Sequence, residues 1–297
     1  MTAPVLQVSD LVVEYPSKGR RSAPLRVLKE VSLDIRPGEC VGLVGESGSG
    51  KTTLGRAILG LAPVTGGEIV YGGRDIAHAP RAARRRMGSE IQVVFQDPYT
   101  SLNPSMTIGD ILAEPLTARR VPKAQARARV GELLDQVQFP SDSLTRLPRE
   151  FSGGQRQRVA IARALALEPK LIICDEPVSA LDLSTQARVL DLFVEIQQRT
   201  GVAYLFITHD LSVVRHVSHR VAVLYRGEIV EWGETAAVTG SPEHPYTQRL
   251  WMAAPVPNPD AQEIRRAERK RLLAVQAEQD EQAGAAVGAG PLVEPRP

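Results

Sequence analysis

The spacing of apolar and polar positions divides the chain into regions of different character. In the N-terminal third the apolar runs are short and partly alternating, which is typical of β-strands. These runs lie at residues 5–15, 31–35, 40–44, 66–71 and 91–96. The first two alternate between apolar and polar residues, and they predict a small antiparallel sheet with one buried face.

The pattern changes at about residue 97. From there to about residue 166 helix-forming residues dominate and prolines interrupt the sequence, which predicts a helical insertion with its clearest helix at residues 124–138. Continuous apolar runs follow, as in strands that are buried on both faces of a parallel sheet. These runs lie at residues 171–174, 203–208 and 221–225. The pattern therefore predicts an α/β core with helices on both sides of the sheet.

The end of the chain has a third composition. Residues 255–259 are rich in proline, residues 261–282 carry a charged helical pattern, and residues 283–297 contain mostly Gly, Ala and Pro with little to bury. We expect one main domain over residues 1–255. We expect residues 256–297 to form an extension that is helical at first and then disordered.

A glycine-rich loop follows the apolar run at residues 40–44. Residues 45–52 have the sequence Gly-Glu-Ser-Gly-Ser-Gly-Lys-Thr, which matches the phosphate-binding loop of nucleoside triphosphatases at every fixed position. The glycines permit a tight turn whose N–H groups point at a polyphosphate, and the following helix dipole adds attraction. Lys51 suits the β/γ oxygens and the Thr52 hydroxyl suits Mg²⁺. The residues expected to bind nucleotide here are Gly45, Glu46, Ser47, Gly48, Ser49, Gly50, Lys51, Thr52 and Thr53.

Two adjacent carboxylates, Asp175 and Glu176, end the apolar run at residues 171–174. A buried strand rarely ends in paired acids without a cation. In phosphate-loop enzymes the first acid holds Mg²⁺ and the second takes a proton from the attacking water. Neighbouring strand residues point to opposite faces, so the two acids have separate tasks. We expect Asp175 to bind the metal and Glu176 to act as the general base.

Further motifs follow in a fixed order. Gln96 ends a strand-like run, residues 151–155 are Phe-Ser-Gly-Gly-Gln, residues 179–182 are Ser-Ala-Leu-Asp, and His209 ends another apolar run. With the phosphate loop and the acid pair, they resemble the Q-loop, signature, D-loop and switch histidine of ATP-binding-cassette (ABC) ATPases. Phe151 replaces the commoner leucine of the signature.

The resemblance covers about residues 5–232 and implies the α/β fold of ABC-type P-loop NTPases. That fold has a RecA-like parallel-sheet core, an N-terminal antiparallel β-subdomain and a helical subdomain, here at about residues 97–166. The implied ligands are ATP and Mg²⁺. The absence of an Asn-Lys-x-Asp guanine-binding pattern also favours ATP over GTP.

The same resemblance implies a composite ATP site in a head-to-tail dimer. Each ATP lies between the phosphate loop of one cassette and the signature of a second, identical or homologous, ATPase subunit. Asp182 is expected to lie across the interface, His209 to contact the γ-phosphate and the attacking water, and Tyr15 to stack on adenine. The other implied site residues are Ser152, Gly153, Gly154 and Gln155 on the nucleotide, and Gln96 in catalysis and, beside Thr52 and Asp175, at the metal.

Two stretches, residues 95–104 and 241–247, resemble the dipeptide/oligopeptide branch of bacterial ABC importers. In that branch the Q-loop and the helical insertion face two transmembrane permease subunits, and an extracytoplasmic substrate-binding protein delivers the cargo. The resemblance implies a peripheral ATPase subunit at the cytoplasmic face of the cell (inner) membrane. Cargo does not touch such a subunit, so peptide, glutathione and nickel all remain open, with peptide preferred.

Composition limits the alternatives. The chain has 297 residues, of which 43% are hydrophobic, enough for a sizeable core, and its net charge of +2 gives no indication of nucleic acid binding. The basic run at residues 81–86 lacks interleaved aromatic residues and is interpreted as a solvated helix face. No run approaches the roughly 18 apolar residues of a membrane span. Cys40 and Cys174 lie within apolar runs and are expected to be buried side chains and not metal ligands.

ABC ATPases that act in DNA repair, chromosome structure or translation are the alternative class. Repair and chromosome proteins place a long coiled coil between phosphate loop and signature, and translation factors usually carry two cassettes. Here residues 52–151 contain prolines and no sustained heptads, and a single set of motifs is present. A transporter subunit is therefore preferred.

Overall fold

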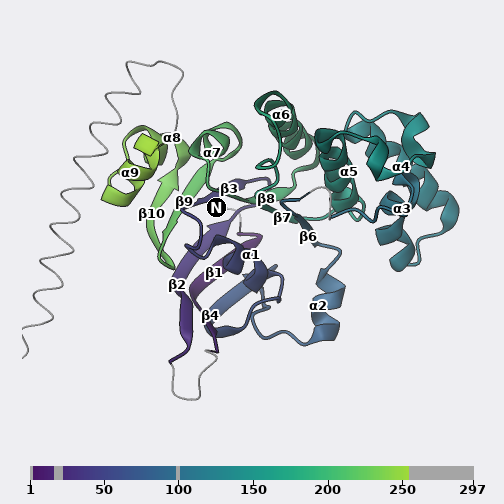
Figure 1. The fold of residues 1–297 in the computed structure, drawn as a ribbon. Helices are drawn as coiled ribbons and strands as arrows, with labels where there is room; N and C mark the ends of the chain where they lie inside the picture. Colours follow the sequence, from purple (N-terminus) through teal and green to yellow (C-terminus); the bar gives the residue numbers. More distant parts are fainter. Residues whose placement is uncertain (1–2, 17–22, 98–100, 254–297) are drawn as a thin grey trace, which may run out of the picture. The chain divides into compact units, whose positions relative to one another are not determined.

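The computed structural model describes residues 3–16, 23–97 and 101–253. The chain divides into two compact units, Met1–Gly240 and Ser241–Pro297 (Figure 1). The first unit contains both sheets and the motifs expected at the nucleotide site, and the described part of the second contains helix α9, Pro245–Ala253. The helical and disordered segments expected at residues 256–297 lie outside the described residues.

An antiparallel sheet is built mainly from the N-terminal part of the chain, with strand order β2-β1-β4-β5. Its strands are β1 (Leu6–Tyr15), β2 (Leu25–Ile35), β4 (Val64–Tyr71) and β5 (Arg74–Asp75). Alternate residues of β1 are buried, which explains why the alternating pattern predicted this sheet. The register of β1 shifts between Val8 and Leu11, where Asp10 adopts a φ of 48°.

The second sheet has six strands in the order β10-β9-β3-β8-β7-β6. Its strands are β3 (Cys40–Val44), β6 (Ile91–Val94), β7 (Leu171–Asp175), β8 (Ala203–Thr208), β9 (Arg220–Tyr225) and β10 (Glu228–Glu234). Strands β6, β7, β8, β3 and β9 pair in parallel, and β10 pairs antiparallel to β9. Every residue of β3 and β8 is buried, as expected for strands covered on both faces.

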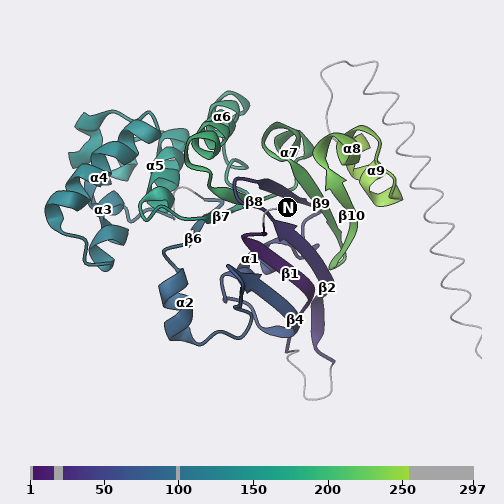
Figure 2. The same ribbon diagram turned by 180° about the vertical axis from the view of Figure 1, so that it is seen from behind.

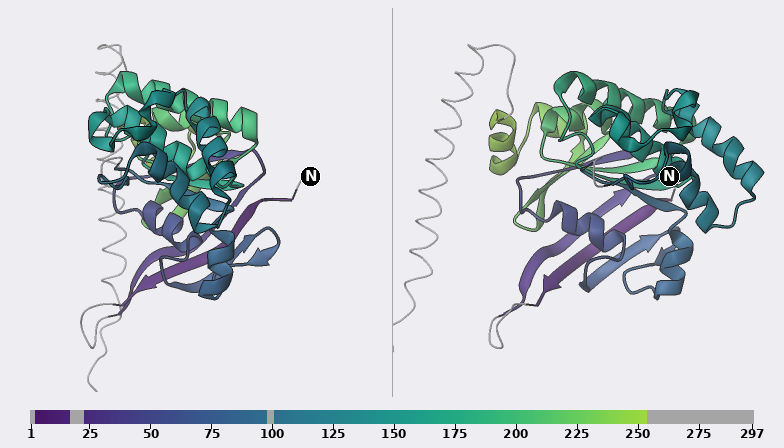
Figure 3. Two further views of the ribbon diagram at one scale, coloured as in Figure 1. Left: turned by 90° about the vertical axis from the view of Figure 1, so that its right-hand side faces the viewer. Right: turned by 45° about the vertical axis from the view of Figure 1, so that its right-hand side comes forward.

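The two faces of this sheet pack against different layers. Cys40, Tyr204 and Cys174 point into a cluster shared with the helices, and their neighbours Val41 and Leu205 point into a cluster shared with the antiparallel sheet. Figure 2 shows the arrangement from behind, and Figure 3 shows most helices of the first unit on one side of the six-stranded sheet, with the antiparallel strands and helix α1 (Lys51–Ile58) on the other. Parallel strands need crossover connections, and these supply the covering helices.

The helices of the first unit vary widely in length. They are α1 (Lys51–Ile58), α2 (Arg81–Met87), α3 (Ile108–Ala118), α4 (Lys123–Gln136), α5 (Gly153–Leu165), α6 (Leu183–Thr200), α7 (Leu211–Val217) and α8 (Thr235–Gly240), with 3₁₀ turns η1 (Ser141–Thr145) and η2 (Pro148–Glu150). Helices α3, α4 and α5 pack together and form the helical insertion. Thr107 caps α3, because its side chain accepts a hydrogen bond from Asp110 N.

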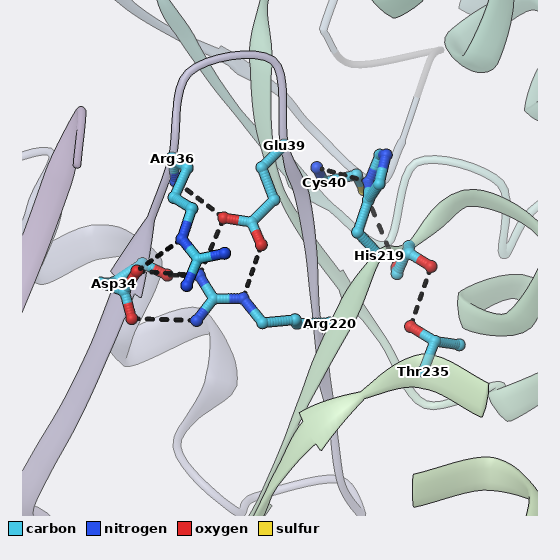
Figure 4. A network of polar contacts seen from close by, with 8 residues as sticks. Asp34, Arg36, Glu39, Cys40, His219, Arg220 and Thr235 are labelled. Atoms are coloured by element: carbon cyan, nitrogen blue, oxygen red, sulfur yellow. Dashed lines mark hydrogen bonds and ion pairs between the residues drawn. The ribbon is translucent and has the colours of Figure 1, made fainter. Parts of the chain in front are cut away.

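A buried ion-pair network joins the two sheets at the start of β9 (Figure 4). The Arg220 guanidinium donates to both carboxylate oxygens of Asp34, at 3.0 and 2.8 Å, and to Glu39 Oε2 at 2.8 Å. It also lies 4.6 Å from the ring centroid of Trp232. The hydrogen bonds from Arg220 lower the pKa of Asp34. The network connects β2, the turn before β3, β9 and β10.

The predicted fold class is confirmed by this architecture, which has an antiparallel sheet, a largely parallel core sheet and a helical insertion. The apolar pattern did not predict β10 or the first half of β2, and Cys40 and Cys174 are buried as expected. Among the described residues, none of the helices combines the length and the apolar character that crossing a bilayer requires.

Candidate nucleotide site

The phosphate loop connects the carboxyl end of β3 to α1, at a point where the backbone has little room. A Cβ at Gly45 would lie 2.1 Å from the carbonyl oxygen of Leu224, so this position admits only glycine. Gly50 has a φ of 111°, a left-handed value that glycine tolerates without strain. Gly48 also has a positive φ, 81°, and faces open space, since no atom lies within 4 Å of its added Cβ. The loop therefore exposes its backbone on the side where a ligand would approach.

Lys51 begins α1 and is folded over this loop. Its Nζ donates to the carbonyl oxygens of Gly45 and Glu46, both at 2.8 Å. Burial lowers the pKa of Lys51, while the nearby carboxylates of Glu176 and Asp175 oppose that shift. No side chain caps the N-terminus of α1, which leaves its first N–H groups available to an anion.

Asp175 ends β7 directly opposite the start of α1. Thr52 Oγ1 donates to Asp175 Oδ1 at 3.1 Å. Burial raises the pKa of Asp175, and the neighbouring Glu176 carboxylate raises it further. A hydroxyl and a carboxylate, with phosphate oxygens beside them, form the hard-oxygen set that Mg²⁺ prefers. No group of three or more His, Cys, Asp or Glu side chains suited to a metal occurs within residues 3–16, 23–97 and 101–253. The donor set fits Mg²⁺ held jointly with a nucleotide.

Glu176 lies between two side chains from other strand ends. Its Oε2 accepts from Gln96 Nε2 at 3.3 Å, and its Oε1 lies 3.3 Å from His209 Nδ1. Its backbone adopts a φ of 49°, a conformation that is strained for a residue with a side chain and that is often found at functional sites. Three residues distant in sequence thus meet at the carboxyl edge of the sheet, where ligands bind in open α/β folds.

A cavity of about 290 Å³ lies over the phosphate loop. Its lining residues are Val27, Ser47, Gly48, Gly50, Lys51, Thr52, Thr53 and Glu176. Ser49 Oγ, within the loop, is buried and has no hydrogen-bond partner. The motifs around residues 45–53 and Glu176 therefore share one hollow, and Asp175, Gln96 and His209 are joined to it by the contacts above.

The signature residues lie elsewhere on the chain. Ser152 caps α5: its Oγ accepts from Gln155 N at 3.3 Å, and Gln155 Oε1 accepts from Ser152 N at 2.9 Å. Ser152, Gly154 and Gln155 line a separate cavity of about 440 Å³ that contains no residue of the phosphate loop. Gly154 packs closely against α6, since an added Cβ would lie 2.2 Å from Thr185 Cγ2. The structure does not bring the signature and the phosphate loop together within one chain.

Asp182 and Tyr15 are among the predicted site residues that line neither cavity. Asp182 caps α6 by accepting hydrogen bonds from Thr185 N at 3.0 Å and Ser184 Oγ at 2.7 Å, and these hydrogen bonds lower its pKa. Tyr15 lies at the end of β1, opposite Leu25, and does not line the phosphate-loop cavity. Their predicted contacts with nucleotide or partner stay predictions.

Two contacts were not foreseen from the sequence. Val27 of β2 lines the phosphate-loop cavity, and Arg163 of α5 donates to the carbonyl oxygen of Ser101 at 2.6 Å. The second contact fixes the segment after Gln96 to the helix that begins at the signature. Val27 lies 20 or more positions from the other lining residues and Arg163 lies 62 positions from Ser101, and local sequence patterns carry no signal for neighbours so far apart.

The fold and the site together define a nucleoside triphosphatase with a phosphate loop and an acid pair, and with a separate capped helix start at Ser152. A profile of the family described as ABC transporter matches residues 28–179. The chain belongs to this family and is one of its ATP-binding subunits, an ATPase. The predicted family and the predicted enzyme class are confirmed.

Relatives with known names agree with this placement. The chain is 50% identical over 259 residues to an ATP-binding protein of Brucella ovis provisionally named for peptide import, a match that covers 87% of this chain and 81% of the relative. It is 48% identical over 268 residues to the glutathione import ATP-binding protein GsiA of Shigella flexneri. That match covers 89% of this chain and 43% of GsiA, so the chain spans less than half of GsiA.

Solved structures show the same fold. The structure of cbiO1 from Clostridium perfringens, part of an ABC transporter complex, superimposes with a TM-score of 0.72 at 27% identity and covers 80% of this chain and 91% of cbiO1. A dimeric ATP-binding cassette in a post-hydrolysis state, bound to ADP and Pi, gives a TM-score of 0.68 at 29% identity, with 77% and 98% of the two chains covered.

Proposed function

We propose that this chain hydrolyses ATP to drive a bacterial importer of dipeptides or oligopeptides. The observation that carries the proposal is the 50% identity, over 87% of the chain, to a relative named for peptide import. The site supports the hydrolytic part, because the phosphate loop and Glu176 share one cavity. Cargo specificity belongs to other subunits in this proposal.

Each residue of the site has its own role in ATP hydrolysis. The loop N–H groups and Lys51 bind the phosphates, and Thr52, Asp175 and Gln96 would hold a Mg²⁺ ion, which would neutralise phosphate charge. The oxygen of a water attacks the γ-phosphorus while the bond to the β–γ bridging oxygen breaks, giving ADP and phosphate. Glu176 takes the proton of that water, and Gln96 and His209 orient the carboxylate from either side.

We further propose that the ATP site is completed by a second ATPase subunit, identical or homologous, arranged head to tail. The separation of the two cavities supports this, because the cavity lined by Ser152 and Gln155 contains no residue of the phosphate loop. The helix start at Ser152 presents N–H groups to an anion, and the γ-phosphate of the opposite subunit supplies that anion. Asp182 lies at the same interface, and Tyr15 stacks on adenine.

Closure of this dimer converts nucleotide binding into work. ATP touches both subunits only in the closed state, so it binds that state more tightly, and shifting the balance from 1:99 to 99:1 takes about 5.5 kcal/mol. Hydrolysis removes the shared γ-phosphate and lets the subunits part. The contact between Arg163 and Ser101 ties the signature helix to the segment after Gln96 and supports transmission of this motion.

In this proposal the subunit is peripheral, at the cytoplasmic face of the cell membrane, with residues 97–166 facing two permease subunits. An extracytoplasmic binding protein delivers the cargo. The ATPase domain extends over residues 1–255, and residues 256–297 form an extension without an assigned role.

Reconstitution tests the proposal. The chain is assembled with the permease subunits and second ATPase subunit in proteoliposomes, and ATP hydrolysis is measured with the binding protein loaded with dipeptide or oligopeptide. Stimulation by loaded binding protein, together with peptide accumulation, is the expected result. ATP hydrolysis that is indifferent to the peptide-loaded protein would contradict peptide import.

Glutathione import is the second candidate. The observation that favours it is the 48% identity over 89% of this chain to GsiA, which is named for glutathione import. The same proteoliposomes distinguish the two, because stimulation by glutathione-loaded and not by peptide-loaded binding protein would favour glutathione.

A further inference from the structure

A cluster of exposed cations lies away from the nucleotide site. Helix α2 and the turn between α3 and α4 contribute five arginines, all exposed. This arginine patch consists of Arg81, Arg85, Arg86, Arg119 and Arg120.

Contacts hold the two parts of the arginine patch together. Arg119 Nη2 donates to the carbonyl oxygens of Arg85 at 2.8 Å and Arg86 at 3.3 Å, which fixes the turn to the end of α2. Arg84 is turned inward and anchors α2, because its Nη1 donates to Ile58 O at 2.7 Å and its Nη2 donates to carbonyl oxygens before the helix. The remaining arginines of α2 are left at the surface.

The charges of the patch are not neutralised locally. In the described part of the chain no ion pair joins any of the five guanidinium groups to a carboxylate, whereas Arg26 and Lys29 on β2 pair with Glu30 and Glu228 at 3.1 Å. The surrounding sequence, residues 78–89 and 117–131, contains neither Asp nor Glu. Since the net charge of the whole chain is only +2, this cluster is a local concentration of charge. Its complement is an extended anionic surface.

We propose that the arginine patch binds the anionic phospholipid headgroups of the membrane. Clusters of about 4–8 basic residues are of the size that anionic leaflets attract. An exposed apolar side chain lies near the point where α2 is anchored: Leu61 is 67% exposed, and its neighbour Gly60 packs on the Arg84 guanidinium, where an added Cβ would lie 2.6 Å from Cζ. An exposed leucine near a helix that carries cations suits the boundary between headgroups and acyl chains. The proposal rests on the proposed function only in that this function brings the chain to a membrane.

The position of the patch keeps it clear of nucleotide. Helix α2 precedes the amino end of β6, whereas the phosphate loop and the acid pair lie at the carboxyl ends of β3 and β7 (Figures 1 and 2). A lipid surface is favoured over nucleic acid because residues 78–89 and 117–131 contain no Phe, Tyr or Trp to stack on bases.

Co-sedimentation of the full chain with lipid vesicles tests the proposal. The vesicles contain phosphatidylcholine alone or phosphatidylcholine mixed with phosphatidylglycerol, at low and at high salt. The R85Q/R86Q variant removes two patch charges and keeps good helix formers in α2. The matched control, R26Q/K29Q, removes two charges from β2. Each patch cation is expected to strengthen binding about fivefold, so R85Q/R86Q should bind mixed vesicles about thirtyfold more weakly.

The expected result is binding to mixed vesicles only, weakened by salt and by R85Q/R86Q, with the control unchanged. Absence of binding, equal binding to neutral vesicles, or equal losses in both variants would overturn the proposal. A loss of duplex DNA binding by R85Q/R86Q with vesicle binding intact would overturn it in favour of nucleic acid. ATP affinity and Tm, measured for both variants, should stay unchanged. ATP hydrolysis is measured separately from lipid binding. A failure to bind lipid would therefore not argue against ATP hydrolysis, and a failure to hydrolyse ATP would not argue against lipid binding.

Discussion

Replacement of Gly154 by alanine should displace the signature without touching the phosphate loop. The added Cβ would lie 2.2 Å from Thr185 Cγ2, whereas carbon atoms pack at about 3.5–4.0 Å. The start of α5 must therefore move away from α6 by roughly an ångström, or Thr185 must change its rotamer. Overpacking of this kind costs about 1–3 kcal/mol.

The substitution should also slow ATP hydrolysis. Displacement of a catalytic group by about 1 Å can cost about 10²-fold in rate, so we expect Gly154→Ala to lower ATP hydrolysis of the assembled transporter by about that factor. Binding of ATP to the isolated chain should be unchanged, because Gly154 does not line the phosphate-loop cavity. The assays are phosphate release, thermal unfolding and nucleotide titration.

Thr185→Ser provides a matched rescue. It removes Cγ2, and the next nearest atom to the added Cβ is then Thr185 Cβ at 3.6 Å, an ordinary contact. The double variant Gly154→Ala/Thr185→Ser should recover most of the ATPase activity, while Thr185→Ser alone should behave like the original chain. Full activity of Gly154→Ala would refute a clash between the added Cβ and Thr185 Cγ2. Hydrolysis by Gly154→Ala/Thr185→Ser that is as slow as that by Gly154→Ala would refute it as well.

Further predictions concern the nucleotide site and the ion-pair network around Arg220. Glu176→Gln should slow hydrolysis about 10²- to 10⁴-fold while ATP binding and dimer closure persist, and unchanged turnover would remove Glu176 from the role of base. Lys51→Ala should weaken ATP binding itself in a titration of the isolated chain, and an unaltered affinity would argue against phosphate contact. Arg220→Met removes the guanidinium that Asp34 and Glu39 share, leaves only Arg36 beside them in the described part of the chain, and should lower the free energy of unfolding by about 3 kcal/mol, measured by denaturant titration. Folding lowers the pKa of Asp34 below its ordinary value of 3.8. The ionised Asp34 carboxylate therefore stabilises the folded chain fully above pH 3.8, and this contribution is lost as the pH falls through the lowered pKa. The difference in the free energy of unfolding between Arg220→Met and the original chain should therefore become smaller below about pH 4. A difference that becomes larger there would contradict stabilisation by the ion pairs of Arg220.

The main elements of the fold could be predicted because their sequences follow simple periods. Strand β8 is a continuous apolar run covered on both faces, and β1 alternates because only one of its faces is buried. Strand β10 was not predicted because its residues are of intermediate burial along most of its length, so its sequence shows no clear apolar face. The first part of β2 is partly exposed and has the same ambiguity.

Some features of the candidate site could also be predicted from the sequence, and others could not. The phosphate loop could be predicted from its residues because its pattern lies within eight consecutive positions, where Gly48 and Gly50 adopt the left-handed φ values of 81° and 111° that the turn requires. The support of Glu176 by Gln96 and His209 depends on strands meeting at one sheet edge, which sequence order alone does not specify. The Arg220 network is also of this kind, since its partners on β2 and before β3 lie more than 180 positions away.

The measurement that bears most directly on shared ATP binding uses Ser152→Glu. ATP affinity is measured for the isolated chain, and ATP hydrolysis is measured after assembly with the second ATPase subunit. We predict that Ser152→Glu leaves the affinity of the isolated chain unchanged and slows hydrolysis in the assembly at least about 10²-fold, since a carboxylate then faces the γ-phosphate of the opposite subunit. Undiminished hydrolysis in the assembly, or an equal loss of affinity in the isolated chain, would contradict a site built from two polypeptides.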